Sequence, residues 1–182
     1  MPARIPRRFF ARSVHEVAPA LIGATLLVDG VGGIIVELEA YHHTEPAAHS
    51  YGGETERNAV MYEPGGVWYV YLCYGMHELL NLVTGPRDYP AAVLIRGVVG
   101  ASGPGRLTKA LLINRRLNGT PATPEGGLWI EDRGVRVPRG AISATPRIGV
   151  DYAGPVWARK PWRFVLGETE ADRLSGGYGL LD

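Results

Sequence analysis

The dipeptide Asp29-Gly30 interrupts a largely apolar segment, residues 26–41, and the arm that follows it alternates cleanly between apolar and polar side chains. Asp-Gly between such segments is a strong signal for the two-residue turn of a β-hairpin. Because successive side chains of a strand point to opposite faces, Glu37, Glu39 and Tyr41 are predicted to share one face, with the core on the other. The chain is therefore expected to be organised around an antiparallel sheet.

A second hairpin is predicted further along the chain, with Tyr74, Gly75 and Met76 at or near its tip. The 25 glycines and 14 prolines also suit a chain that is rich in turns and short strands. We expect one compact α+β domain over residues 1–182, in which a curved antiparallel sheet carries short flanking helices and a protruding aromatic β-hairpin, and residues 1–12 form a basic N-terminal arm. The remaining elements are expected as a helix after the capping box Ser13-Val-His-Glu16, a helix within 103–114, and strands at 91–98, 128–131, 142–150 and 163–166.

The formal net charge of +1 conceals two oppositely charged segments. Residues 29–63 carry seven acidic side chains against one basic, and residues 133–163 carry seven basic side chains against Asp151. The arginine-rich segments form a positive face if they fold together, and are ordinary solvated charges if they do not. No apolar run of about 18 residues is present, so no membrane partner is expected. The single cysteine, Cys73, excludes an internal disulfide and a multi-cysteine zinc site.

Carboxylates, a tyrosine and three histidines gather in the segment Glu37–His49. A carboxylate held rigidly at the end of a strand can serve as a general base that activates water. The same residues also suit an exposed edge strand with polar side chains. A third interpretation is a metal site, although the spacing of the candidate ligands fits no specific zinc signature; these ligands are Glu39, His42, His43, Glu45 and His49.

Four aromatic residues mark the second hairpin: Trp68, Tyr69, Tyr71 and Tyr74. Alternation places Tyr69 and Tyr71 on one face, where they form a stacking platform for nucleobases or part of a packed core. Tyr74, at a turn, exposes apolar surface that suits a wedge between stacked bases. A basic segment follows at 157–164, and its guanidinium groups suit phosphates. A carboxylate base, aromatic stacking, a wedge and phosphate contacts together fit a reaction on a nucleotide flipped out of a duplex.

An ordered set of motifs runs from about Ser13 to Leu166: Glu37-Leu-Glu-Ala-Tyr41, Ala47-Ala-His-Ser50, Arg57-Asn58, Val60-Met61, Pro64-Gly65, Tyr69-Val-Tyr71, Tyr74-Gly-Met76, Asn81, Leu94-Ile-Arg96 and Ala158-Arg-Lys-Pro161. These motifs closely resemble those of the alkyladenine, or 3-methyladenine, DNA glycosylase family. The resemblance implies a monofunctional enzyme without a cofactor that acts as a monomer on double-stranded DNA. It implies that damaged purines are flipped and excised to leave an abasic site, among them 3-methyladenine, 7-methylguanine, hypoxanthine and ethenoadenine.

The resemblance also implies roles for individual residues. Glu39 is similar to the general base that deprotonates water, and Arg96 and the backbone carbonyl of Ile148 are expected to hold that water. In the base pocket, Tyr41, His49 and Tyr71 are similar to the residues that sandwich the flipped base, and Asn81 to the one that excludes normal guanine. Tyr74 resembles the wedge, flanked by Met76 and His77, and Arg147 of the arginine-rich segment 133–163 is expected to contact DNA. Tyr51 and His77 depart from the family pattern, which has an arginine and an aromatic residue there.

Two other functions remain open at this point. The chain is also compatible with a nonenzymatic nucleic-acid-binding module, in which the tyrosines form the stacking platform and Glu39 is merely exposed. A metal-dependent hydrolase built on the cluster from Glu39 to His49 is a third interpretation. An enzyme of DNA repair is expected to be intracellular, in the cytoplasm and nucleoid of a bacterium or the nucleus of a eukaryote.

Overall fold

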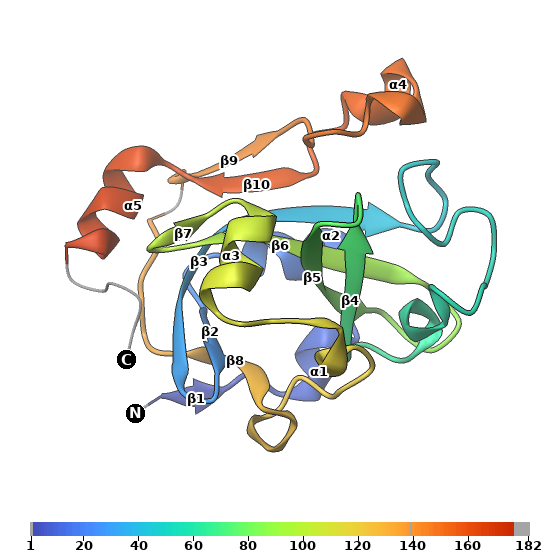
Figure 1. The fold of residues 1–182 in the computed structure, drawn as a ribbon. Helices are drawn as coiled ribbons and strands as arrows, with labels where there is room; N and C mark the ends of the chain where they lie inside the picture. The colour runs from blue at the N-terminus through green and yellow to red at the C-terminus, as the bar shows by residue number, and fades with distance from the viewer. Residues whose placement is uncertain (1, 139, 177–182) are drawn as a thin grey trace.

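The computed structural model describes residues 2–138 and 140–176, and its centre is an antiparallel sheet of ten strands (Figure 1). Met1 of the expected N-terminal arm and Arg139 of the arginine-rich segment lie outside the described residues. The main path of the sheet runs β1-β8-β2-β3-β6-β5-β4, while β7 pairs with β6 and β10 pairs with both β3 and β9. The strands are β1 Ala3–Arg4, β2 Thr25–Val28, β3 Val31–His42, β4 Trp68–Cys73, β5 His77–Thr84, β6 Ala91–Val98, β7 Ala101–Ser102, β8 Leu128–Asp132, β9 Ile142–Thr145 and β10 Arg163–Leu166.

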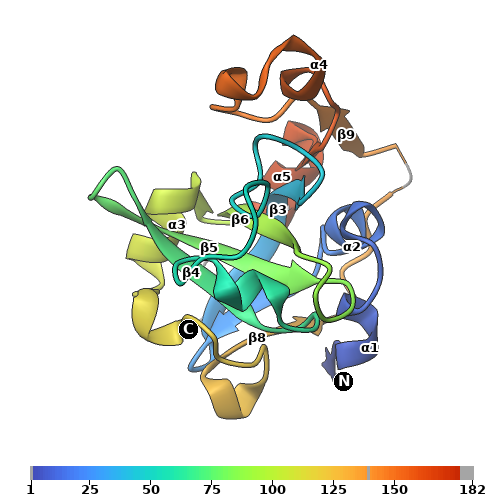
Figure 2. The ribbon, with the colours of Figure 1, turned by 90° about the vertical axis from the view of Figure 1, so that its right-hand side faces the viewer.

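Short helices lie around this sheet, so the predicted α+β class is confirmed (Figures 1 and 2). Most of them are no longer than two turns. None of the helices in the described part of the chain is long and apolar enough to cross a bilayer. They are α1 Arg7–Phe10, α2 Val14–Ala20, α3 Pro104–Ala110, α4 Pro155–Ala158 and α5 Glu168–Ser175, with the short 3₁₀ turns η1 Ala59–Tyr62, η2 Arg115–Leu117, η3 Pro124–Gly126 and η4 Asp151–Ala153.

The hairpin predicted around Asp29-Gly30 is confirmed as β2 and β3. Both turn residues have positive φ, 49° and 90°, as a type I′ turn requires, and Gly30 adopts this conformation without a Cβ penalty. β3 then runs for twelve residues through the middle of the sheet, pairing with β2, β6 and β10. Leu38 and Ala40 are fully buried in the main core, so Glu37, Glu39 and Tyr41 share the opposite face, as predicted.

The N-terminal segment, expected to be a basic arm, is largely folded against the sheet. Ala3 and Arg4 form β1, which pairs with Asp132 and Glu131 of β8. Phe10 at the end of α1 is 1% exposed and joins the main core. The arginines of this segment favour a solvated arm, but burial of its apolar side chains, such as Phe10, holds the segment against the sheet.

The aromatic hairpin consists of β4 and β5, and its alternation is as predicted. Trp68 and Val70 enter the main core, whereas Tyr69 and Tyr71 face a second cluster on the other side of the sheet. Tyr74 lies at the tip with φ of 49° and is 89% exposed, and the Met76 N–H donates to the Cys73 carbonyl to close the turn. Figure 2 shows this tip extending away from the rest of the molecule.

Two expected boundaries differ from the structure, and one helix had no prediction. The strand expected over 142–150 ends at Thr145, because Pro146 cannot donate to a ladder and Gly149 has a positive φ of 75°. The helix within 103–114 is limited to α3, and Leu112 just beyond it has a left-handed φ of 54°. Helix α5 follows the last predicted strand and was not expected; it buries Leu174 against the main core.

Candidate active site

The carboxylate of Glu39 is completely buried, although β3 carries it on the face away from the main core. Its Oε2 accepts a hydrogen bond of 2.7 Å from the Tyr41 hydroxyl, and its Oε1 accepts one of 2.8 Å from the Ile148 backbone N–H. Arg96 Nη1 lies 3.5 Å from Oε2 and supplies a positive charge. A buried charge needs such partners, and together they hold both oxygens of this carboxylate in fixed positions.

Arg96 is itself held by a second carboxylate, Glu37. Oε1 of Glu37 accepts hydrogen bonds from Arg96 Nε at 2.8 Å and from Arg163 Nε at 2.7 Å. Burial raises the pKa of Glu37, but the hydrogen bonds from Arg163 and Arg96 outweigh this effect, so that the net pKa lies below its usual value. Arg163, Glu37, Arg96 and Glu39 thus form an alternating chain of charges that ends at the buried carboxylate.

A pocket opens beside Glu39, and its walls include Tyr41, His49, Tyr71, Asn81 and Ile148. Tyr41 and Ile148 line the pocket and also donate to the two oxygens of Glu39, so the carboxylate lies directly behind the wall. Burial and the negative charge of Glu39 raise the pKa of Tyr41, which keeps its hydroxyl a donor. The pocket therefore combines aromatic side chains with a rigidly held carboxylate.

His49 lines the same pocket from the end of the 43–49 loop. Its Nδ1 lies 3.0 Å from the Tyr69 hydroxyl, and its ring meets the ring of Tyr71 edge-on at 4.4 Å. Burial lowers the pKa of His49, which favours the neutral ring. Asn58 anchors the end of this loop, since its Nδ2 donates to the carbonyls of His49 and Gly53 at 2.9 Å each.

The structure brings most of the predicted site residues together. Tyr41, His49, Tyr71, Asn81 and Ile148 all line the pocket, with Glu39 and Arg96 behind it. Ile148, expected to contribute its carbonyl, contributes its N–H to Glu39. The predicted wedge residues Tyr74, Met76 and His77 lie apart from the pocket, at the exposed tip and the start of β5.

Arg147 is the one predicted site residue that the structure removes from its expected role. Its side chain is completely buried and forms a two-pronged ion pair with Glu45, whose Oε1 accepts from Nη1 at 2.6 Å. Nη1 also donates to the Ala40 carbonyl at 2.8 Å. The prediction that Arg147 contacts DNA is therefore wrong, because this guanidinium does not reach the surface.

The candidate metal ligands of the sequence do not converge. Glu45 is paired with Arg147, His49 with the Tyr69 hydroxyl and Glu39 with Tyr41. Within residues 2–138 and 140–176, no three His, Cys, Asp or Glu side chains are placed to hold a metal ion together. The hypothesis of a metal centre from Glu39 to His49 thus finds no support in the geometry.

Three features of the site had no individual prediction. Asn58 belongs to the motif Arg57-Asn58, and its side-chain amide has the donors and the acceptor that a residue needs to hold a loop through buried hydrogen bonds. Tyr152 lines the pocket from η4 and donates to the Ala47 carbonyl at 3.2 Å. The Glu45–Arg147 pair joins residues 102 positions apart, so no local sequence pattern could have predicted it.

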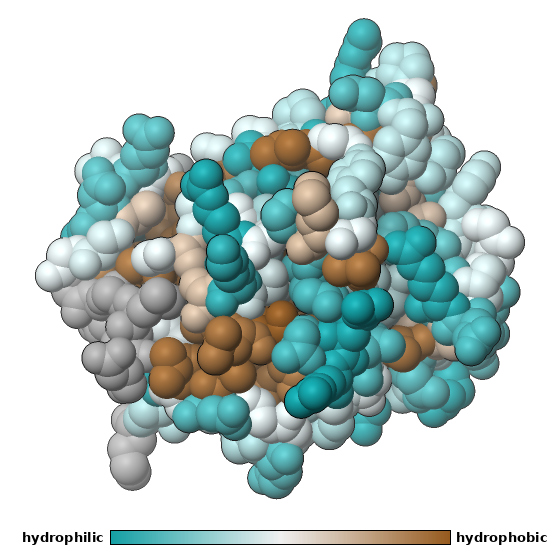
Figure 3. Space-filling view, viewed as in Figure 1, coloured by the Kyte–Doolittle hydropathy of each residue, from teal (hydrophilic) through white to brown (hydrophobic). Residues whose placement is uncertain are grey.

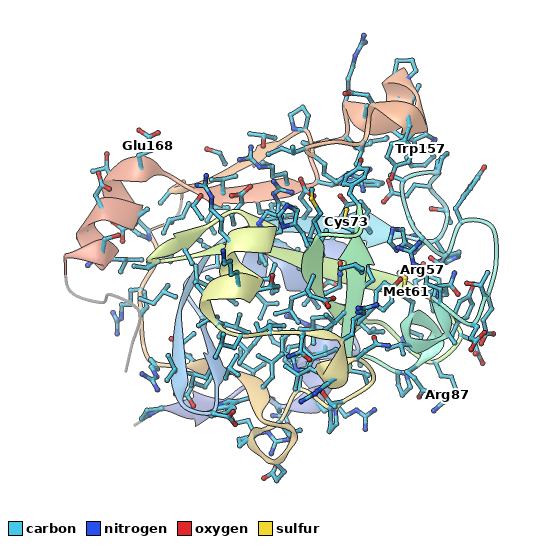
Figure 4. The ribbon with its side chains drawn as sticks, in the orientation of Figure 1. Arg57, Met61, Cys73, Arg87, Trp157 and Glu168 are labelled. Carbon is cyan, nitrogen blue, oxygen red and sulfur yellow. The ribbon has the colours of Figure 1, made fainter. Side chains whose placement is uncertain are left out.

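On the molecular surface, hydrophilic side chains cover much of the face that carries the hairpin, and apolar patches interrupt them (Figure 3). In the view with side chains, Cys73 near the hairpin tip, Met61 and Arg57 lie on the same side of the molecule, and Trp157 of α4 lies above them (Figure 4). Met61 belongs to the pocket lining, and Trp157 and Tyr41 both pack against a small buried cluster of Ala47, Val150 and Ala153. The pocket thus lies between the hairpin and the α4 region.

Comparison with known proteins gives a consistent result. The model of the methylpurine-DNA glycosylase (MPG) family matches residues 8–170. A protein of Rhodopseudomonas palustris (strain HaA2) is 49% identical over 179 residues, covering 88% of this chain and 85% of its own. One from Anaeromyxobacter sp. (strain Fw109-5) is 42% identical, covering 96% and 95%. Both bear the name "Putative 3-methyladenine DNA glycosylase". With a match over nearly its whole length and relatives close to half identical, the chain belongs to the methylpurine-DNA glycosylase family.

Proposed function

We propose that this DNA glycosylase flips a damaged purine into the pocket and hydrolyses its N-glycosidic bond with a water molecule activated by Glu39. The observation that carries the proposal is the buried Glu39 carboxylate, held by Tyr41 and Ile148 directly behind the pocket wall. Glu39 takes a proton from water, the oxygen attacks C1′ of the sugar, and the C1′–N bond breaks with its electrons leaving on the purine. The carboxylate also stabilises positive charge that develops on the sugar ring.

The aromatic walls provide the binding energy for the base. Tyr41, His49 and Tyr71 in the pocket lining offer ring faces and edges to a flipped purine. Stacking of a base on an aromatic side chain is worth about 1–3 kcal/mol and tolerates different bases. Such a pocket suits alkylated purines, which carry positive charge and leave readily, and admits the neutral lesions hypoxanthine and ethenoadenine when the leaving group is activated.

Selectivity against normal guanine is assigned to Asn81. It is 5% exposed, and its Nδ2 donates to the Tyr69 and Leu79 carbonyls at 3.3 and 3.5 Å, so the amide has little freedom to move. A rigid side chain at this position crowds the exocyclic amine that guanine carries and adenine-derived lesions lack there. Tyr74, at the hairpin tip, fills the space that the flipped nucleotide leaves in the duplex.

The working unit is proposed to be a monomer on double-stranded DNA. The pocket lining, the proposed general base Glu39 and the proposed wedge Tyr74 all come from one chain. None of these groups requires a residue from a second copy.

The test compares wild type with Glu39→Gln on duplex oligonucleotides that carry hypoxanthine or a methylated purine, with and without EDTA. We expect wild type to release the free base and leave alkali-labile abasic sites, with or without EDTA, and Glu39→Gln to bind the duplex without releasing base. Equal release by both proteins would refute the role of Glu39. Binding without release by wild type would support a nonenzymatic module, and loss of release in EDTA would support a metal-dependent hydrolase.

A further inference from the structure

We propose that the buried ion pair Glu45–Arg147 is a positioning element that joins the two walls of the base pocket and sets the geometry of Glu39. Neither residue touches the base or the water; both act through the neighbours that they hold. The inference rests on the proposed function, because it assigns the pair to the same pocket and the same general base.

Arg147 connects its own segment to three other parts of the chain. Its guanidinium binds both oxygens of Glu45 in the 43–49 loop and the Ala40 carbonyl of β3. Its Nη2 lies 3.5 Å from the Trp157 carbonyl of α4. The planar, forked geometry of arginine allows one side chain to make these contacts together, which the single ammonium of lysine cannot do.

The contacts of Arg147 converge on Glu39. The carbonyl that Arg147 binds belongs to Ala40, the residue between Glu39 and Tyr41. The guanidinium also lies 4.6 Å from the centre of the Tyr41 ring, on whose hydroxyl Glu39 depends. Ile148, the next residue in the chain, donates its N–H to the other oxygen of Glu39. A shift of Arg147 therefore disturbs both hydrogen bonds that orient the carboxylate.

Glu45 makes the corresponding connection on the other wall. Its Oε1 accepts from the His42 N–H at 3.0 Å, which closes the turn at the end of β3, and the loop continues from it to Ala47 and His49 in the pocket lining. The Glu45–Arg147 pair thus ties the wall formed by the 43–49 loop to the wall that begins at Ile148. Both side chains are completely buried, so solvent does not compete for the pair.

The energetics argue that the pair is kept for geometry. Burying two charges costs much of what their attraction returns, and well-packed apolar side chains in place of a buried ion pair often leave stability unchanged or higher. In the described part of the chain, Arg147 Nε is buried and has no hydrogen-bond partner, which adds to the cost. The charges do, however, bind the carbonyls of Ala40 and Trp157 and the N–H of His42, and so fix the positions of three backbone groups around the pocket, which apolar side chains cannot do.

The experiment replaces both partners together, as Glu45→Leu/Arg147→Met, and measures urea unfolding and the single-turnover rate of base release from a hypoxanthine duplex. We expect the double variant to lose tenfold or more in rate per folded molecule, with its affinity for undamaged duplex unchanged; its midpoint should fall, because three backbone groups lose their partners. A purely structural pair predicts the same lower midpoint with a normal rate for the folded fraction. A normal rate in the double variant would overturn the proposal.

Controls separate this proposal from the one on which it rests. The exposed pair Glu63–Arg87, changed to Glu63→Gln/Arg87→Met, lies outside the pocket lining and should leave the rate unchanged. Full activity of Glu39→Gln would refute the proposed function. If Glu39→Gln is inactive but Glu45→Leu/Arg147→Met is fully active, only the positioning role of the ion pair is refuted. If the double variant does not fold, Arg147→Lys decides: a tenfold lower rate supports the proposal and a normal rate overturns it.

Discussion

Substitution of Glu37 by glutamine tests whether the chain of charges behind the pocket contributes to the stability of the protein and to the rate of base release. The carboxylate of Glu37 is 13% exposed and accepts two charged hydrogen bonds, from Arg96 and Arg163. Hydrogen bonds to charged groups are worth about 1.5–3 kcal/mol each. A glutamine oxygen still accepts from the charged arginines but has no opposite charge, so each of the two bonds should lose about 1–2 kcal/mol. Glu37→Gln should therefore lower the free energy of unfolding by about 2–4 kcal/mol at pH 7.

The pH dependence of this loss follows from the lowered pKa of Glu37. A carboxylate whose pKa is lower in the folded protein contributes its stability above the unfolded value of 4.5, and that stability disappears as the pH falls through the folded pKa. The difference between wild type and Glu37→Gln should thus be full at pH 7 and shrink steadily below about pH 4.5.

Urea unfolding followed by tryptophan fluorescence measures this difference at a series of pH values. Glu63→Gln is the control, because Glu63 forms an exposed pair with Arg87 that should contribute less than about 1 kcal/mol. The single-turnover rate of Glu37→Gln should also fall, since Arg96 loses the partner that holds it beside Glu39. A stability difference that stays constant from pH 7 down to pH 3, or that is no larger than the control, would refute the reasoning.

Three further substitutions test the pocket and the hairpin. Tyr74→Ala should leave the melting temperature unchanged, because the side chain is 89% exposed, and should reduce flipping, as reported by a fluorescent base beside the lesion. Tyr41→Phe removes the donor to Glu39 Oε2 and should slow single-turnover base release by about tenfold to a hundredfold. Asn58→Ala removes the anchor of His49 and should lower the free energy of unfolding by about 2–4 kcal/mol in urea titrations, with weaker binding of lesion-containing duplex.

The parts of the fold that the sequence predicted well are those set by local chemistry. Asp29-Gly30 defines a turn with its own two residues, and the alternation in β4 decides which tyrosines share a face. The strand 91–98 was predicted with the bounds that β6 has, since a continuous apolar run between turn residues has few other solutions. Local signals of this kind do not depend on what the rest of the chain does.

The parts that were missed depend on contacts between distant residues. Arg147 stands in an arginine-rich segment that is typical of a surface, yet Glu45, 102 residues away, provides the partner that makes its burial tolerable. The N-terminal arginines likewise suggested a basic arm, and the pairing of β1 with the edge of β8 was not predicted. Charge composition predicts how a segment interacts with water; it does not say whether another segment will cover it.

The hydrogen bond from Ile148 to Glu39 spans 109 positions of the chain, and β10 pairs with β3 across a similar separation. Synthesis proceeds from the N-terminus, so Glu39, the aromatic walls and the hairpin are all made before the segment that orients the base. A nascent chain that ends before Ile148 therefore lacks the N–H that holds Oε1 of Glu39. The arrangement around this carboxylate is complete only after the last strand has paired with β3.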